Sequence, residues 1–127
     1  MRMVIDDVYS KEKLFKPINK NDFALTYDMC SKNDYSDCKV RMLVSQEVWH
    51  PLAVVIVKDT PNGEITIYSF EVHPEDKLSN VGRRMLTHFK ENANLITLCS
   101  LNESKMFYLK LGFEEQEENR MIWRRKL

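Results

Sequence analysis

Two apolar segments that flank a tight turn constrain the fold of this chain more than any other feature. Aliphatic residues fill every position from Leu52 to Val57, and a strand over Leu52–Lys58 with this pattern is typically internal, with both faces buried. The sequence Asp59-Thr60-Pro61-Asn62-Gly63 predicts a turn. It joins the first strand to a second over Glu64–Val72, so we expect an antiparallel hairpin at the centre of a sheet.

The second strand of this hairpin is predicted to be apolar on both faces. Strict alternation places Ile65 and Ile67 on one face. The same alternation places Tyr68, Phe70 and Val72 on the other. A strand with two apolar faces is central, and His73-Pro74 ends it.

The remaining elements alternate between helix and strand. The segment Asn19–Asp22 offers N-caps for a helix over about residues 23–31, with Phe23, Tyr27 and Cys30 on one face. We further expect strands at 39–45, 95–99, 113–116 and 121–125, a helix at 81–91 with a buried stripe of Val81, Met85, Leu86 and Phe89, and a helix at 103–111 ended by Gly112. Because a strand, a helix and a strand follow one another over 64–100, two strands must be parallel, and the fold class is α/β with a mixed sheet.

Composition and charge exclude several classes of protein. With 127 residues, of which 43% are hydrophobic and 30% charged, the chain is expected to form one domain over 1–127. Nineteen Lys and Arg balance nineteen Asp and Glu, which argues against a nucleic-acid partner. The longest aliphatic run is too short for a bilayer, the N-terminus lacks an apolar signal core, and three cysteines form no metal-binding pattern. We therefore expect a cytoplasmic protein with reduced thiols, without a metal or a membrane partner.

The start of the helix at 81–91 carries an unusual set of charges. Arg83 and Arg84 lie in its first turn, where the helix dipole disfavours cations. A polyphosphate bound to the free N–H groups of this turn would offset that positive charge, and Lys77 and Ser79 would add donors. The alternative is a solvent-facing helix with incidental arginines.

Two motifs in this region resemble those of the GNAT acetyltransferase superfamily. The segment Val72-His73-Pro74-Glu75-Asp76-Lys77-Leu78-Ser79-Asn80-Val81-Gly82-Arg83-Arg84-Met85-Leu86 is similar to motif A of that family without a gap. The segment Phe107-Tyr108-Leu109-Lys110-Leu111-Gly112-Phe113 matches the end of motif B. The resemblance covers about residues 52–127. It implies a GNAT-like, mostly antiparallel central sheet with a splayed parallel strand pair and flanking helices.

The resemblance also implies an activity and a cofactor. Members of this family transfer an acetyl group from acetyl-CoA to an amine, so acetyl-CoA is the expected acyl donor and a primary amine the expected acceptor. The residues that it assigns to cofactor binding are Phe70, Glu71, Val72, Lys77, Leu78, Ser79, Asn80, Val81, Gly82, Arg83, Asn102 and Tyr108. A bulky residue at Gly82 is then expected to weaken cofactor binding with little effect on folding.

Two positions of motif A depart from the family pattern. Lys77 stands where Arg or Gln is usual, and Asn80 stands where the family has its first glycine. Asparagine adopts the left-handed conformation more readily than other non-glycine residues, so the turn can be kept.

The expected catalytic residues are Tyr108 and Glu71. Tyr108 occupies the position of the family's general acid, which protonates the departing thiolate. Its alternative role is that of an aromatic core residue beside Phe107. Glu71 is a candidate general base because Ile65 and Ile67 on its expected face would raise its pKa.

The sequence leaves other assignments of the general base open. Glu71 could equally be a solvated carboxylate at a strand end. Glu64, His73 and His50 are further candidates, and the amine could instead lose its proton to water before it binds.

The acceptor and the partners are not specified by the sequence. The acidic run Glu114–Glu118 could attract a cationic amine, but most such runs are solvated turns. A monomer or a homodimer is compatible with the sequence. The alternatives to an enzyme are a catalytically degenerate GNAT-like module that binds CoA or a protein, and an unrelated α/β interaction domain.

Overall fold

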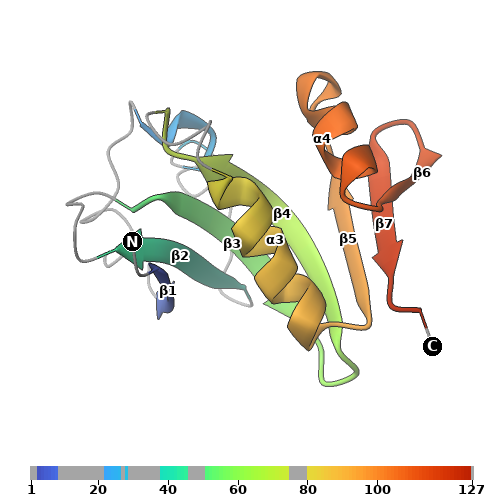
Figure 1. Cartoon of the computed structure of the whole chain (residues 1–127), viewed down its shortest axis with the longest axis horizontal. Helices are drawn as coiled ribbons and strands as arrows, with labels where there is room; N and C mark the ends of the chain where they lie inside the picture. The colour runs from blue at the N-terminus through green and yellow to red at the C-terminus, as the bar shows by residue number, and fades with distance from the viewer. Residues whose placement is uncertain are drawn as a thin grey trace.

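The hairpin predicted from the sequence lies inside a seven-stranded mixed sheet (Figure 1). The computed structural model describes residues 3–8, 22–26, 28, 38–45, 51–74 and 80–126. The strands are β1 (Met3–Val8), β2 (Lys39–Ser45), β3 (Ala53–Asp59), β4 (Glu64–Val72), β5 (Leu95–Cys99), β6 (Glu114–Glu117) and β7 (Arg120–Arg124). Their order is β1-β2-β3-β4-β5-β7-β6, and only β4 and β5 are parallel. The predicted mixed α/β sheet with one parallel pair is confirmed.

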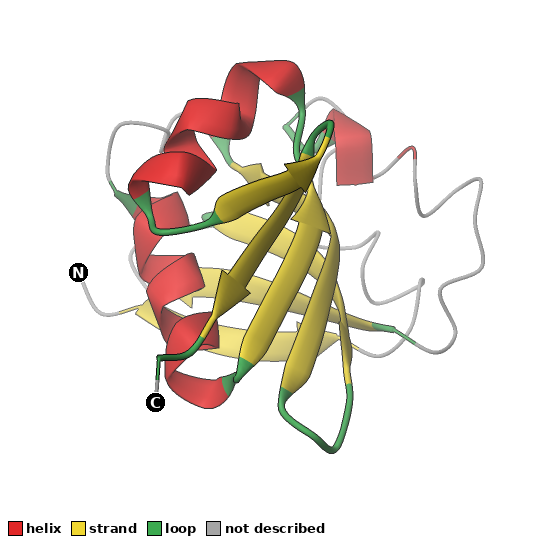
Figure 2. Cartoon of the chain, turned by 90° about the vertical axis from the view of Figure 1, so that its right-hand side faces the viewer, coloured by secondary structure: helices red, strands yellow, loops and turns green. Residues whose placement is uncertain are grey.

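Two helices follow β4 and β5. Helix α3 (Val81–Asn92) crosses between these parallel strands, and a 3₁₀ turn, η2 (Asn102–Ser104), leads into α4 (Lys105–Lys110). The turned view in Figure 2 shows both helices against the yellow sheet. The predicted stripe of α3 is confirmed, because Val81, Met85, Leu86 and Phe89 are all buried.

The core lies between α3 and the middle strands. β3 is fully buried from Ala53 to Val57, as its aliphatic run predicted. β4 and β5 contribute Ile65, Ile67, Ile96 and Leu98, and Tyr108, Phe113 and Met121 close the core beneath α4. Among the described residues, no helix combines the length and apolar character that a membrane span requires.

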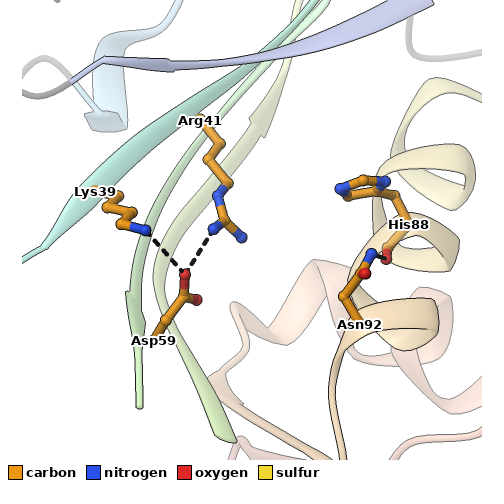
Figure 3. A network of polar contacts seen from close by, with 5 residues as sticks. All are labelled: Lys39, Arg41, Asp59, His88 and Asn92. Carbon is orange, nitrogen blue, oxygen red and sulfur yellow. Dashed lines mark hydrogen bonds and ion pairs between the residues drawn. The ribbon is translucent and has the colours of Figure 1, made fainter. Parts of the chain in front are cut away.

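A polar cluster anchors the sheet near the second half of α3 (Figure 3). Arg41 of β2 donates to the Asp59 carboxylate of β3 at 2.6 Å, and Lys39 lies 3.7 Å from the same oxygen. The guanidinium of Arg41 also lies 5.7 Å from the ring centre of Phe89 on α3. This arrangement lets a charged side chain pack against the apolar face of the helix because its charge is paired.

The N-terminal part differs from the expectation in two respects. Strand β1 was not predicted, because Asp6 and Asp7 interrupt its apolar pattern. Of the helix expected over 23–31, residues 24–26 and 28 are helical and the rest lies outside the described residues, including Tyr27 and Cys30. Phe23 is fully buried, as its predicted face requires.

Candidate active site

The candidate site lies where the two parallel strands separate. The pairing of β4 with β5 ends at Ile67↔Leu98, whereas β4 continues to Val72. In Figure 1 the strands diverge toward the end of the sheet at which α3 and α4 begin. Over Phe70–Val72, the edge of β4 that faces the opening is therefore paired neither with β5 nor with any other described strand, which suits an extended ligand.

A bulge at Tyr68 changes which side chains face α3. Ile56 pairs with Ser69 and Val57 with Ile67, so one extra residue is inserted in β4. Paired residues of neighbouring strands share a face, so the residues of β4 on the α3 side are those opposite Ala53, Val55, Val57 and Asp59 of β3. They are Ile65, Ile67, Phe70 and Val72.

Because of the bulge, the predicted alternation of β4 is wrong beyond Ile67, and Phe70 and Val72 lie on the same face as Ile65 and Ile67. Glu71 pairs with Val54 and so lies on the face opposite Ile65 and Ile67. The expected apolar environment of its carboxylate is therefore wrong. Strict alternation failed because the sequence gives no sign of the inserted residue.

Helix α3 begins with the backbone conformation that the motif requires. Asn80 is its N-cap residue and adopts the left-handed conformation, with φ 58° and ψ 19°. This confirms that asparagine can replace glycine at the turn. The Asn80 side chain makes no capping hydrogen bond, and the first helical bond runs from the Arg84 N–H to the Asn80 carbonyl at 3.0 Å. The preceding N–H groups of α3 therefore remain available to an anion.

The charge around this helix start is positive. No acidic residue lies in the first turn of α3, and Arg83 and Arg84 are exposed. A groove of about 460 Å³ begins at Asn80 and runs along the helix past Arg83, Arg84 and His88 to Glu91, so its positive charge lies at the helix start. Three further residues that were predicted to bind the cofactor, Lys77, Leu78 and Ser79, lie outside the described residues.

Gly82 is needed for packing between α3 and its neighbours. A Cβ atom at Gly82 would lie 3.1 Å from Cζ of Phe107, 3.4 Å from Val72 and 3.5 Å from Phe70. These distances lead us to expect that a bulky residue here affects folding more than the sequence alone predicted. Phe70 and Val72 likewise direct their side chains at α3, so only their backbone faces the opening between the strands.

Tyr108 lies in the core at the base of α4. Its side chain is buried, with ring-centre distances of 5.2 Å to Phe107 and 5.6 Å to Phe113 in edge-to-face geometry. Burial raises the pKa of Tyr108 to about 12. The phenol therefore keeps its proton at neutral pH and can donate it. Asn102, which was also predicted to bind the cofactor, is exposed at the first position of η2.

The segment 22–26, helical from residue 24, is attached to the far face of β4 and to His73 by three contacts. The Thr26 backbone N–H donates to Oε1 of Glu71, and the Thr26 hydroxyl lies 3.1 Å from the Ser69 hydroxyl. His73 Nε2 lies 3.1 Å from Oδ2 of Asp22. Sequence reasoning missed Thr26, Ser69 and Asp22, because no local pattern reports contacts across more than forty residues.

The residues considered as general base differ in burial and in their contacts. His73 is buried and paired with Asp22, and Phe23 packs edge-on against its ring at 5.7 Å, so the imidazole is held inside the fold. Glu71 is half-buried at the end of β4. Glu64 is exposed at the other end of the strand, and His50 lies outside the described residues. Within the described ranges, no group of three or more His, Cys, Asp and Glu side chains could hold a metal.

Solved acetyltransferase structures share this architecture. Tetrahymena GCN5 matches with a TM-score of 0.69 at 12% identity, over 98% of this chain and 96% of that chain. The IAA acetyltransferase from Bacillus cereus ATCC 14579 matches with a TM-score of 0.68 at 15% identity, over 98% and 100%. An acetyltransferase of the GNAT family from Staphylococcus aureus Mu50 matches with a TM-score of 0.61 at 13% identity, over 95% and 98%. No protein-family profile and no curated protein sequence matches this chain.

This chain has the GNAT fold. The resemblance inferred from the two motifs is thereby confirmed at the level of the fold, including the splayed parallel pair. In the GNAT fold as built here, the opening between β4 and β5, the start of α3 and the start of α4 meet at one end of the sheet. Tyr108, Asn80 and Glu71 come from these three parts of the chain.

Proposed function

We propose that this protein is an acetyl-CoA-dependent N-acetyltransferase that acetylates a primary amine, on a small molecule or on a protein lysine or N-terminus. The observation that carries the proposal is the left-handed Asn80 at the start of α3, beside the unpaired edge of β4. The two features supply the two things that CoA requires, a set of free N–H groups for its pyrophosphate and a strand edge for its pantetheine arm.

The residues present fit this acyl donor. The uncapped N–H groups of Val81, Gly82 and Arg83, together with the exposed Arg83 and Arg84 side chains in the first turn, suit a pyrophosphate. The backbone groups of Phe70 and Val72 alternate away from β3, so they can pair with an amide-containing arm and direct an N–H at the thioester oxygen, which would polarise the carbonyl. Lys77, Leu78, Ser79 and Asn102 complete the proposed binding set.

The transfer requires two proton movements. The amine nitrogen attacks the acyl carbon, the new C–N bond forms as the C–S bond breaks, and one amine proton must leave. Glu71 is the proposed acceptor of that proton, directly or through water, because its carboxylate lies at the end of β4 and is held there by Thr26.

Tyr108 is the proposed donor to the departing thiolate. With a pKa of about 12, it would donate poorly to a thiolate in water, where thiol pKa values are about 8.5. The same desolvation that raises the pKa of the phenol also raises that of a thiolate in the pocket. Proton transfer is therefore favourable only if the thiolate forms out of contact with water.

The proposal is tested by calorimetric titration with acetyl-CoA and with CoA, followed by a panel of amines with detection of free CoA thiol. Micromolar binding and acetylated product are expected. Replacing Arg83 and Arg84 together by Gln should weaken binding about tenfold, whereas the matched change Lys110→Gln on α4 should not. Binding without product from any amine would instead identify a degenerate CoA-binding module, and absence of binding would contradict the assignment of the site.

A further inference from the structure

A second groove lies at the opposite end of the sheet from the proposed acetyl-transfer site. It encloses about 540 Å³ and is lined by Gly112 and Glu114 and by residues 122–126 of β7 and the segment after it. Arg124 pairs with Leu95, the first residue of β5, whereas the opening between β4 and β5 begins beyond the other end of β5. In Figure 2, where β6 and β7 face the viewer, this end lies toward the C-terminus.

The groove follows an unpaired strand edge. The pairing of β6 with β7 stops at Glu114↔Ile122, so the chain from Trp123 onward has β5 on one side and no described strand on the other. Trp123 and Arg124 are consecutive and so point to opposite faces of the sheet. Both can line one cavity only at a free edge, and the groove therefore contains that edge.

The backbone at this edge points donors into the groove. The Arg125 N–H donates to the Asn94 carbonyl at 2.9 Å, on the β5 side. Because backbone groups of a strand alternate in direction, the N–H of Arg124, the last residue of β7, points to the opposite side, and in a chain that continues extended past β7 the N–H of Lys126 does so too. The edge thus offers one main-chain donor at the end of β7, and a second from Lys126, with the spacing of a β-ladder, where the chain stays extended.

The side chains of the groove are cationic with one apolar wall. Within the described residues, Arg124 and Lys126 are exposed and make no ion pair. Glu114 is the single acidic lining residue. Trp123 is half-buried and held on one side by the Lys90 ammonium group, 5.5 Å from its ring centre. A rigid aromatic wall beside two unpaired cations favours an anionic partner with some apolar surface.

We propose that this groove binds an acidic polypeptide segment in extended conformation, which adds a short strand to the free edge of β7. The N–H groups of Arg124 and Lys126 would bond its carbonyls, the two cationic side chains would pair with its carboxylates, and Trp123 would pack against an apolar side chain. Trp123 and Arg124 lie on opposite faces of β7, and a peptide that adds a strand at the edge can place side chains on both faces. A small aromatic anion would contact one face only. The inference does not depend on the proposed acetyltransferase activity.

Trp123 provides the measurement. The sequence contains two tryptophans, so a Trp49→Phe variant carries Trp123 as its single indole reporter for fluorescence and for the indole N–H resonance. The probe is an N-acetylated, C-amidated hexapeptide of alternating Glu and Val, compared with the Lys–Val peptide and with free glutamate. We expect a saturable change with the Glu–Val peptide and none with the Lys–Val peptide.

Matched variants separate charge from backbone bonding. Arg124→Gln with Lys126→Gln should weaken the Glu–Val peptide at least tenfold, while Arg120→Gln, an exposed cation at the other end of β7, should change it less than twofold. Lys126→Pro, which also removes the outward N–H, should weaken binding further than Lys126→Gln. Unchanged far-ultraviolet circular dichroism shows that each variant is folded. No saturable change, equal response to free glutamate, or insensitivity to the Arg124 and Lys126 changes would overturn the proposal.

Discussion

The carboxylate of Glu71 accepts a hydrogen bond from the backbone N–H of Thr26, a residue 45 positions earlier in the chain. The N-terminal segment thereby fixes the orientation of the side chain proposed as the general base. One carboxylate oxygen is used for this contact. The other is not hydrogen-bonded to any described residue, so it is available to an incoming amine or water.

Replacing Glu71 by Gln tests this role with little structural change, because the amide oxygen can still accept the Thr26 N–H. We expect kcat/KM at neutral pH to fall about 10²-fold, with acetyl-CoA affinity unchanged. The matched control is Glu64→Gln, at the exposed start of the same strand. A kcat/KM of Glu71→Gln equal to that of Glu64→Gln would assign the proton to water instead.

The Tyr108→Phe variant removes the proposed acid while keeping the aromatic packing with Phe107 and Phe113. We expect kcat to fall about tenfold to a hundredfold and the dissociation constant of acetyl-CoA to stay within twofold. Steady-state kinetics and calorimetry on the same preparation measure the two quantities. Unchanged kcat would leave Tyr108 with a packing role only.

The raised pKa of Tyr108 also predicts a loss of stability at alkaline pH. The folded state holds this proton up to about pH 12, whereas the unfolded chain releases it near pH 10. The free energy of unfolding should therefore fall between these values, by up to about 3 kcal/mol from this group. Urea unfolding of wild type and Tyr108→Phe at pH 9, 10 and 11 isolates the contribution. A stability difference between the two that does not change with pH would contradict the burial of the phenol.

The sequence predicted most elements for a clear physical reason. The stripe on α3 and the aliphatic run of β3 are local patterns, and burial follows directly from them. The prediction that Glu71 shares a face with Ile65 and Ile67 was wrong because the bulge at Tyr68 has no local sequence signal. The Thr26–Glu71 contact was missed because it joins distant segments, and β1 because acidic residues are tolerated on a strand at the edge of a sheet.

Substitutions at Gly82 should act on folding according to size. Gly82→Ala gains about 1 kcal/mol of helix propensity, which offsets the close approach of its Cβ to the tip of Phe107, so we expect little net change. Gly82→Leu should lower the free energy of unfolding by about 2 to 3 kcal/mol, because neither Val72 nor Phe70 can move away without opening the core. Chemical denaturation measures both, with Thr87→Leu on the exposed face of α3 as the control. Equal stability of Gly82→Leu and wild type would contradict this packing.

Arg125 closes the end of α3 from a distant part of the chain. Its guanidinium donates to the carbonyls of Lys90, Glu91 and Ala93 at 2.8, 3.1 and 3.0 Å, which satisfies acceptors that the end of the helix leaves free. We expect Arg125→Gln to lower the free energy of unfolding by about 1 to 2 kcal/mol and to increase amide hydrogen exchange in the last turn of α3. The neighbouring Arg124→Gln is the control, since within the described residues its side chain makes no such bonds. If both variants lose the same stability, the loss reflects charge rather than capping.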